Sequence, residues 1–233
     1  MNKKTKILYF SDVLCVWAYI AQIRLDEVIK NFGDNIDLSY HFVSIFGSTE
    51  DKIKQGWQDR GEYKGYSEHV LSVAKQFKHC EVHPAIWTKN IPASSASCHL
   101  FLKAIHLLEK KQIISNERCV QHGNCSLYEA AIRQIRTAFF KDLVNVATYE
   151  SQIEIAKSLG LPVDDITKLI KNGEAYAELC LDLKLKDQYS ITGSPTYILN
   201  EGRQKLYGNV GYRVIEANIK EILQSPGDQA SWC

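Results

Sequence analysis

The chain has 233 residues, of which 45% are hydrophobic and 24% are charged, and its formal net charge is +1. This composition is that of an ordinary globular protein, long enough for one composite domain or two small ones. The only tight basic clusters are Lys3-Lys4 and Lys110-Lys111, which argues against a nucleic-acid partner. No run approaches the roughly 20 apolar residues that a membrane span requires, so we expect no membrane partner.

The first predicted element is a strand from Ile7 to Phe10, which is continuously apolar. A central strand that is buried on both faces has this pattern. The stretch is too short for the hydrophobic region of a signal peptide and is followed by Ser-Asp. The seven cysteines are an odd number and cannot all pair within the chain. We therefore expect reduced thiols and a cytoplasmic protein.

A cysteine stands where this strand gives way to a helix. Cys15 follows a short turn and precedes an aromatic-rich helix, which Gly33 is expected to end. The N–H groups and dipole of a helix N-terminus favour a thiolate, so we expect Cys15 to be a nucleophile that is ionised near neutral pH. Asp12 is either a buried carboxylate that tunes the thiol or simply the end of the strand. Trp17 either forms one wall of the site or is a core aromatic residue.

Alternating apolar residues predict a second strand from Leu38 to Phe42, which completes a βαβ unit with parallel strands. From about residue 50 to 188 helical stripes replace the strand pattern. One helix in this insertion is expected to begin at a cap formed by Asp164 or Asp165.

The pattern returns to β near the C-terminus. Strands at Thr196–Leu199 and Lys205–Tyr207 flank the turn sequence Asn200-Glu201-Gly202, which predicts a hairpin. A closing helix follows, with Ile215 to Leu223 supplying its buried face.

The run from Ile191 to Ile198 places Gly193 and Pro195 immediately before this hairpin. Together with the order strand, Cys15, helix, it resembles the DsbA-like branch of the thioredoxin superfamily. The nearest group in that branch contains FrnE-type oxidoreductases, 2-hydroxychromene-2-carboxylate isomerases and kappa-class glutathione transferases. The resemblance covers nearly the whole chain and includes the segment Ile135–Phe140.

This resemblance implies an α/β, thioredoxin-like fold with βαβ and ββα halves and a large inserted helical domain. Residues 1–50 and 188–224 would form the thioredoxin-like domain, 51–187 the inserted domain and 225–233 a C-terminal tail. The resemblance also implies that the Ser194–Pro195 bond is cis and that Pro195 faces Cys15 across the sheet edge. The active site is therefore expected at the junction of the two domains.

The chain departs from both halves of this group at the expected active site. Thiol–disulfide oxidoreductases of the family carry Cys-x-x-Cys, whereas Ala18 stands three residues after Cys15 here. Without that second thiol, release of a mixed disulfide needs glutathione or a distant cysteine. In the isomerases and transferases the position of Cys15 is a serine that hydrogen-bonds the glutathione thiolate.

Three functional hypotheses follow. The first is a DsbA-like thiol–disulfide oxidoreductase that uses a single cysteine with glutathione or another external thiol. The second is a glutathione-dependent transferase or isomerase that acts on a small hydrophobic electrophile. The third is a thioredoxin-like peptide-binding module with weak or no catalysis. The expected partners are a small thiol or disulfide, or a protein disulfide, and a homodimer is left open.

Two positions are candidates for binding glutathione or a peptide. Ser194 should offer its backbone N–H and C=O to an extended chain. Relatives hold the γ-glutamyl end of glutathione with a Gly-Ser-Asp-Arg or Gly-Gln-Asp-Arg run at the start of the last helix. The corresponding run here, Gly208 to Arg213, lacks the Asp. Asn209 can still bind a carboxylate at a helix N-terminus, or it is a plain helix cap.

The remaining cysteines carry weaker patterns. Cys80 and His83 have the Cys-x-x-His spacing, but no second pair stands nearby to complete a zinc site, so no metal is expected. Cys119 and Cys125 flank an expected loop and are either a redox pair or unpaired thiols. Cys233 is either an exposed thiol or the group that resolves a mixed disulfide at Cys15.

Overall fold

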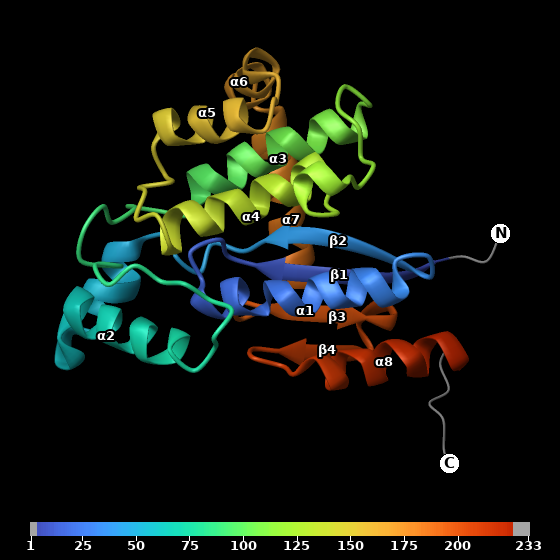
Figure 1. The fold of residues 1–233 in the computed structure, drawn as a ribbon, viewed down its shortest axis with the longest axis horizontal. Helices are drawn as coiled ribbons and strands as arrows, with labels where there is room; N and C mark the ends of the chain where they lie inside the picture. Colours follow the sequence, from blue (N-terminus) through green and yellow to red (C-terminus); the bar gives the residue numbers. More distant parts are fainter. Residues whose placement is uncertain (1–3, 226–233) are drawn as a thin grey trace.

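The computed structural model describes residues 4–225. Its centre is a four-stranded sheet of order β2-β1-β3-β4 (Figure 1). The strands are β1 (Thr5–Ser11), β2 (Ile36–Phe42), β3 (Thr196–Leu199) and β4 (Gln204–Tyr207). β1 runs parallel to β2, and β3 is antiparallel to both β1 and β4. The predicted βαβ unit and C-terminal hairpin are confirmed.

Helices cover both faces of this sheet. α1 (Val16–Phe32) and α8 (Tyr212–Gln224) lie on one face, and α7 (Glu174–Gln188) lies behind the other (Figure 1). The alternation of strand side chains explains this arrangement, because successive residues point to opposite faces. Tyr9 packs into the main core, whereas Phe10 packs with Ile198 against Leu185 of α7. The last helix of the insertion therefore covers the sheet directly.

The rest of the insertion forms two groups of helices. α3 (Ala96–Lys110), α4 (Leu127–Phe140), α5 (Tyr149–Ser158) and α6 (Val163–Lys171) gather beyond the β2 edge of the sheet (Figure 1). α2 (Glu62–Ala74) lies apart from them, at the end of the sheet where α1 begins. Short helical turns complete the insertion, namely η1 (Glu50–Gln55), η2 (Gln58–Arg60) and η3 (Val120–His122), and η4 (Asn200–Gly202) lies in the hairpin turn. No helix within residues 4–225 is long and apolar enough to cross a membrane.

The expected cap of α6 is wrong. Pro162 occupies the N-cap position, and Asp164 and Asp165 lie in the first turn without capping it through their side chains. Carboxylates in the first turn still interact favourably with the positive end of the helix dipole. The pattern of acidic residues thus marked the helix start correctly but not the capping residue.

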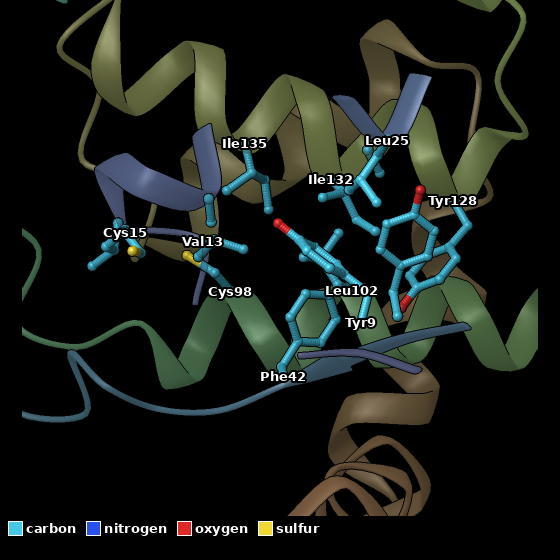
Figure 2. Close-up of a cluster of buried hydrophobic side chains, with 14 of the residues drawn as sticks. Tyr9, Val13, Cys15, Leu25, Phe42, Cys98, Leu102, Tyr128, Ile132 and Ile135 are labelled. Carbon is cyan, nitrogen blue, oxygen red and sulfur yellow. The ribbon is translucent and has the colours of Figure 1, made fainter. Parts of the chain in front are cut away.

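A continuous core joins the sheet to the inserted helices. Figure 2 shows Tyr9 of β1, Phe42 of β2, Leu102 of α3 and Ile132 of α4 in one cluster, with Cys15 at one end of it. Each of the first four is at most 1% exposed, and burying such a side chain contributes roughly 1.5–3 kcal/mol. The sequence stretch that carries Cys15 is therefore fixed by packing from two directions.

A buried ion pair connects the inserted helices to β2 at the edge of the sheet. Lys103 of α3 lies 2.7 Å from the carboxylate of Asp182 on α7, and both side chains are 2% exposed. The same carboxylate accepts hydrogen bonds from the backbone N–H of Phe42 and from the His41 ring on β2. Burial alone would raise the pKa of Asp182, but the His41 hydrogen bond and the Lys103 charge outweigh it and lower that pKa. α3, α7 and β2 thus meet at one carboxylate.

Replacing Lys103 by Met tests this junction. The substitution leaves the Asp182 charge buried without its cation, so we expect a loss of about 3–5 kcal/mol in unfolding free energy, measured by urea unfolding. Lys110→Met is the matched control, because Lys110 also joins α3 to α7 through Glu178 but is half exposed. We expect the control to cost less than about 1 kcal/mol. Equal effects of the two substitutions would contradict the proposed junction.

Candidate active site

The Cys15 side chain lies at the start of α1. Cys15 is the N-cap residue of that helix, and its backbone carbonyl accepts from the N–H groups of Ala18 and Tyr19. Its Sγ lies 3.2 Å from the carbonyl oxygen of Ser194, so the thiol donates its proton to that oxygen. The residue is 7% exposed. The predicted placement of Cys15 at a strand–helix junction is confirmed.

Ser194 and Pro195 approach Cys15 from the other half of the sheet. The Ser194–Pro195 peptide bond is cis, as the resemblance implied. The Ser194 side-chain oxygen accepts a hydrogen bond from the backbone N–H of Asp12 at 2.9 Å. Within residues 4–225 no acceptor is found for the Ser194 N–H. This loop therefore faces Cys15 with the Ser194 carbonyl engaged and the Ser194 N–H unpaired within the described residues.

A close contact by Gly193 holds this loop against the hairpin. A Cβ atom at Gly193 would lie 2.4 Å from the ring of Tyr207 on β4. The Gly193 carbonyl also accepts a 2.9 Å hydrogen bond from the Thr196 hydroxyl. A side chain at Gly193 would therefore have to displace the exposed ring of Tyr207.

Asp12 is the centre of the polar contacts beneath the site. Its side chain is fully buried. One carboxylate oxygen accepts from the Leu14 N–H at 2.9 Å, and the other accepts from the Phe46 N–H at 2.8 Å and the Ser95 hydroxyl at 2.7 Å. Asp12 thereby ties the turn before Cys15 to the loop after β2 and to the start of α3. Both carboxylate oxygens accept hydrogen bonds from within the protein. Any effect of Asp12 on a substrate is therefore indirect, through the groups that it positions.

His99 of α3 lies beside this carboxylate and was not identified from the sequence. Its Nε2 accepts a 3.4 Å hydrogen bond from the Val13 N–H, and its ring stacks on Phe42. Burial lowers the pKa of His99, although the Asp12 charge opposes this. The 3.7 Å separation between Nε2 and Asp12 is therefore a contact of a neutral ring rather than an ion pair. His99 lies on an apolar stripe of α3. The sequence alone therefore cannot distinguish a histidine that contacts Asp12 from one that only packs in the core.

The environment of Cys15 opposes ionisation of the thiol. Burial raises the pKa of the Cys15 thiol, and the Asp12 charge adds to that effect. The side chain of Ser194 and the N–H groups of Ala18 and Trp17 act in the opposite direction and lower the pKa, but they do not cancel the effect of burial. The raised pKa runs against the expectation of a thiolate near neutral pH, because desolvation opposes the effect of the helix N-terminus.

Aromatic side chains lie near the site. Trp17 is half-buried in the first turn of α1 and meets the Phe77 ring edge to face at 6.3 Å. Tyr66 of α2 is close enough to Cys15 and Asp12 that their charges add to the effect of burial, which raises the pKa of its hydroxyl. Tyr66 packs against Trp57 and Trp87 at 5.0 and 5.5 Å. Tyr66 and the two tryptophans thus form an aromatic cluster that the sequence pattern did not connect to Cys15.

Asn209 lies in the loop between β4 and α8. Gly211, not Asn209, is the N-cap of α8, and Asn209 is exposed two residues before it. The alternative that Asn209 is a plain helix cap is therefore wrong, because the helix starts later. The loop still adjoins the candidate site, since the Gly208 N–H donates a 2.9 Å hydrogen bond to the Pro195 carbonyl.

Comparison with known proteins places this geometry in a family. A model described as a DSBA-like thioredoxin domain matches residues 6–220. The chain belongs to the DsbA-like thioredoxin family. None of the curated proteins matches it.

Solved structures share the fold of this DsbA-like protein at low sequence identity. Cytosolic disulfide reductase DsbM from Pseudomonas aeruginosa is 18% identical with a TM-score of 0.65, covering 92% of this chain and 98% of that one. The structure of the same reductase with glutathione is 19% identical with a TM-score of 0.64, and the match covers 92% of this chain and 99% of that one. A 2-hydroxychromene-2-carboxylate isomerase is 12% identical with a TM-score of 0.61, and the match covers 94% of this chain and 96% of that one. At these identities the likeness shows the fold alone.

Cys80, Cys119 and Cys125 do not contact Cys15 in any interaction found within residues 4–225. Cys119 and Cys125 are both free thiols and face each other across an isolated antiparallel bridge. Cys80 is a free, half-buried thiol. No group of three or more metal-ligating side chains is found within residues 4–225. The prediction for Cys233 lies outside the described residues.

Substituting Asp12 by Asn tests whether this carboxylate positions the site. An amide accepts hydrogen bonds through only one of its two terminal atoms, so a buried N–H group or the Ser95 hydroxyl loses its acceptor. We expect the unfolding free energy to fall by about 2–3 kcal/mol, measured by urea unfolding. Ser95→Ala removes a single donor and should cost about 1 kcal/mol. An Asp12→Asn protein as stable as the parent would show that the carboxylate does not organise this region.

The pH dependence of Cys15 alkylation tests whether burial raises the pKa of its thiol. We expect iodoacetamide to modify Cys15 with a midpoint above the roughly 8.5 of a free cysteine, because burial and the Asp12 charge both disfavour the thiolate. Peptide mass spectrometry resolves Cys15 from the other thiols, and exposed Cys180 is the internal control. A midpoint near 7 or below would mean that the helix N-terminus dominates.

Proposed function

We propose that this protein catalyses thiol–disulfide exchange with Cys15 as its single nucleophile, and that an external thiol such as glutathione completes each cycle. The observation that carries the proposal is the geometry at Cys15. Its thiol lies at a helix start and contacts the carbonyl of Ser194, next to the cis Pro195. Ala18, which is fully buried, stands where a second cysteine would be. Because alanine has no thiol, the second thiol must come from elsewhere.

The cycle has two balanced exchange steps. In the first, the Cys15 thiolate attacks one sulfur of a substrate disulfide, forms a mixed disulfide with it and expels the other sulfur as a thiolate. In the second, an external thiolate attacks the substrate sulfur of the mixed disulfide and expels Cys15 as a thiolate. The external thiol thus ends in a disulfide with the substrate, and a further thiol of the same class reduces that product.

Ionisation of Cys15 must be coupled to substrate binding in this mechanism. The free thiol donates its proton to the Ser194 carbonyl. An extended substrate strand that pairs with Ser194 would bring its own N–H to that carbonyl and its own C=O to the available Ser194 N–H. The thiol would then lose its acceptor, while the N–H groups of Ala18 and Trp17 remain to stabilise the thiolate.

The neighbours in structure support this assignment and suggest a compartment. DsbM is a cytosolic disulfide reductase that has been solved with glutathione. A cytoplasmic location suits a monothiol mechanism, because glutathione keeps thiols reduced there. The loop that carries Asn209 adjoins Pro195 and is our candidate for holding the γ-glutamyl end of glutathione.

A glutathione-dependent isomerase or transferase is the second candidate function. The observation in its favour is the aromatic cluster of Tyr66, Trp57 and Trp87, in which Tyr66 lies near Cys15. Aromatic side chains near the thiol would suit a small hydrophobic electrophile. A 2-hydroxychromene-2-carboxylate isomerase is among the structures that share the fold.

The raised pKa of Cys15 also favours a third candidate, a peptide-binding module in which Ser194 and Pro195 hold an extended chain without chemistry. This candidate and the exchange enzyme differ in one respect. Only the enzyme forms a covalent mixed disulfide at Cys15.

Two substitutions separate these functions. Cys15→Ser should abolish reduction of a model peptide disulfide by glutathione, because the attacking sulfur is lost. Ala18→Cys should restore the second thiol and shorten the lifetime of the mixed disulfide, measured by quenching with acid and mass spectrometry. We expect the parent protein to accumulate a Cys15–glutathione adduct when mixed with oxidised glutathione, and the Ala18→Cys variant to form an intramolecular disulfide instead.

The controls distinguish the alternatives. Val16→Cys places a thiol one residue from Cys15 and should not release the adduct, since adjacent cysteines lack the Cys-x-x-Cys geometry. Retained glutathione-dependent isomerisation of an aromatic substrate by Cys15→Ser would favour the second candidate. Absence of any adduct at Cys15, with peptide binding retained, would contradict exchange and favour the binding module.

A further inference from the structure

A cavity separate from Cys15 lies between α1 and α4. Its volume is about 290 Å³. α1 supplies one wall, α4 the opposite wall, and His79 and Cys80 close it from the segment that follows α2. The Nε2 of His79 lies 3.1 Å from the Ile20 carbonyl on α1, which holds this segment in place. The lining residues on the two helices are Tyr19, Gln22, Ile23, Asp26, Arg133, Arg136 and Thr137.

Arg136 brings a buried positive charge to this cavity. Its side chain is 1% exposed. Its two terminal nitrogens donate to neutral oxygens, one to Gln22 at 2.5 Å and the other to the Ser11 hydroxyl at 2.9 Å. Its Nε has no partner within residues 4–225. Burying a guanidinium without a directly bonded carboxylate costs free energy. A bound anion would offset this cost.

Arg133 adds a second guanidinium. It forms a close ion pair with Asp26, whose carboxylate also accepts a 3.1 Å hydrogen bond from Gln22. The Nε of Arg133 is buried and has no partner in the described part of the chain. The cavity is therefore lined by two guanidinium groups and one carboxylate, which leaves one positive charge uncompensated.

We propose that this cavity binds a small oxyanion, either a carboxylate or a phosphate, through the guanidinium groups of Arg133 and Arg136. Guanidinium groups bind both kinds of anion with matched hydrogen bonds. The volume is at the lower end of ordinary ligand pockets, which restricts the ligand to a small molecule. This site is independent of the exchange reaction proposed for Cys15, because neither Cys15 nor Ser194 lines it.

Cys80 provides a reporter for the test, because it lines the cavity as a free thiol. Iodoacetate and iodoacetamide form adducts of similar size but differ in charge. We expect the ratio of the iodoacetate rate to the iodoacetamide rate to be roughly tenfold higher at Cys80 than at exposed Cys180, as an uncompensated cation nearby would produce. Peptide mass spectrometry at constant pH and ionic strength gives both rates. Equal ratios at the two cysteines would contradict the proposal.

Competition identifies the anion. Inorganic phosphate or succinate, added at constant ionic strength with chloride as the reference, should slow iodoacetate modification of Cys80 and leave Cys180 unchanged. Protection by phosphate alone assigns a phosphate ligand, and protection by succinate alone assigns a carboxylate. If neither anion protects Cys80, the site does not exist.

Variants link the protection to the two arginines. Arg133→Gln should lower the Cys80 rate ratio and abolish protection, whereas Lys168→Gln removes one exposed positive charge on α6 and should change neither. Thr137→Met fills the cavity without changing its charge, and should abolish protection by either anion. This second variant keeps the test valid if Arg133→Gln disturbs the fold. Full protection in both Arg133→Gln and Thr137→Met would overturn the assignment.

Discussion

The buried carboxylate of Asp12 is the interaction on which the site depends. It accepts hydrogen bonds from the turn that leads to Cys15, from the loop after β2 and from the start of α3. Its backbone N–H in turn holds the Ser194 side chain. A buried charge is tolerated only when hydrogen bonds surround it, so these segments are fixed relative to one another by a single side chain. Because the sheet and the insertion both contribute donors, the candidate site depends on contact between the two.

The same burial that organises the site also limits its reactivity. A helix N-terminus favours a thiolate, but Cys15 is almost fully buried and lies near the Asp12 charge, and the net effect raises the pKa of its thiol. The Ser194 carbonyl then acts as the acceptor of the thiol proton. In the mechanism that we propose, a substrate competes for this carbonyl. Reactivity would then depend on an extended chain docking beside Pro195, which would protect the free thiol from unselective oxidation.

Much of the fold could be predicted from local patterns. The strand before Cys15, the hairpin around Asn200–Gly202 and the cis bond before Pro195 follow from apolar runs, turn residues and a family motif. What the sequence could not predict depends on long-range packing. His99 lies on an apolar stripe and Tyr66 on a separate helix, and only the tertiary structure brings them to Asp12 and Cys15. Nothing in the sequence indicated the burial that raises the pKa of Cys15, because burial cannot be derived from a position at a helix start.

The most direct test of the account compares two pH profiles of Cys15. One is its alkylation by iodoacetamide, a small reagent that does not engage Ser194. The other is the single-turnover formation of a mixed disulfide with an extended peptide disulfide at saturating concentration. The account predicts a midpoint for the peptide reaction at least one pH unit below that for alkylation, because docking removes the acceptor of the thiol proton. Coincident midpoints above about 8.5 would contradict substrate-coupled ionisation at Cys15.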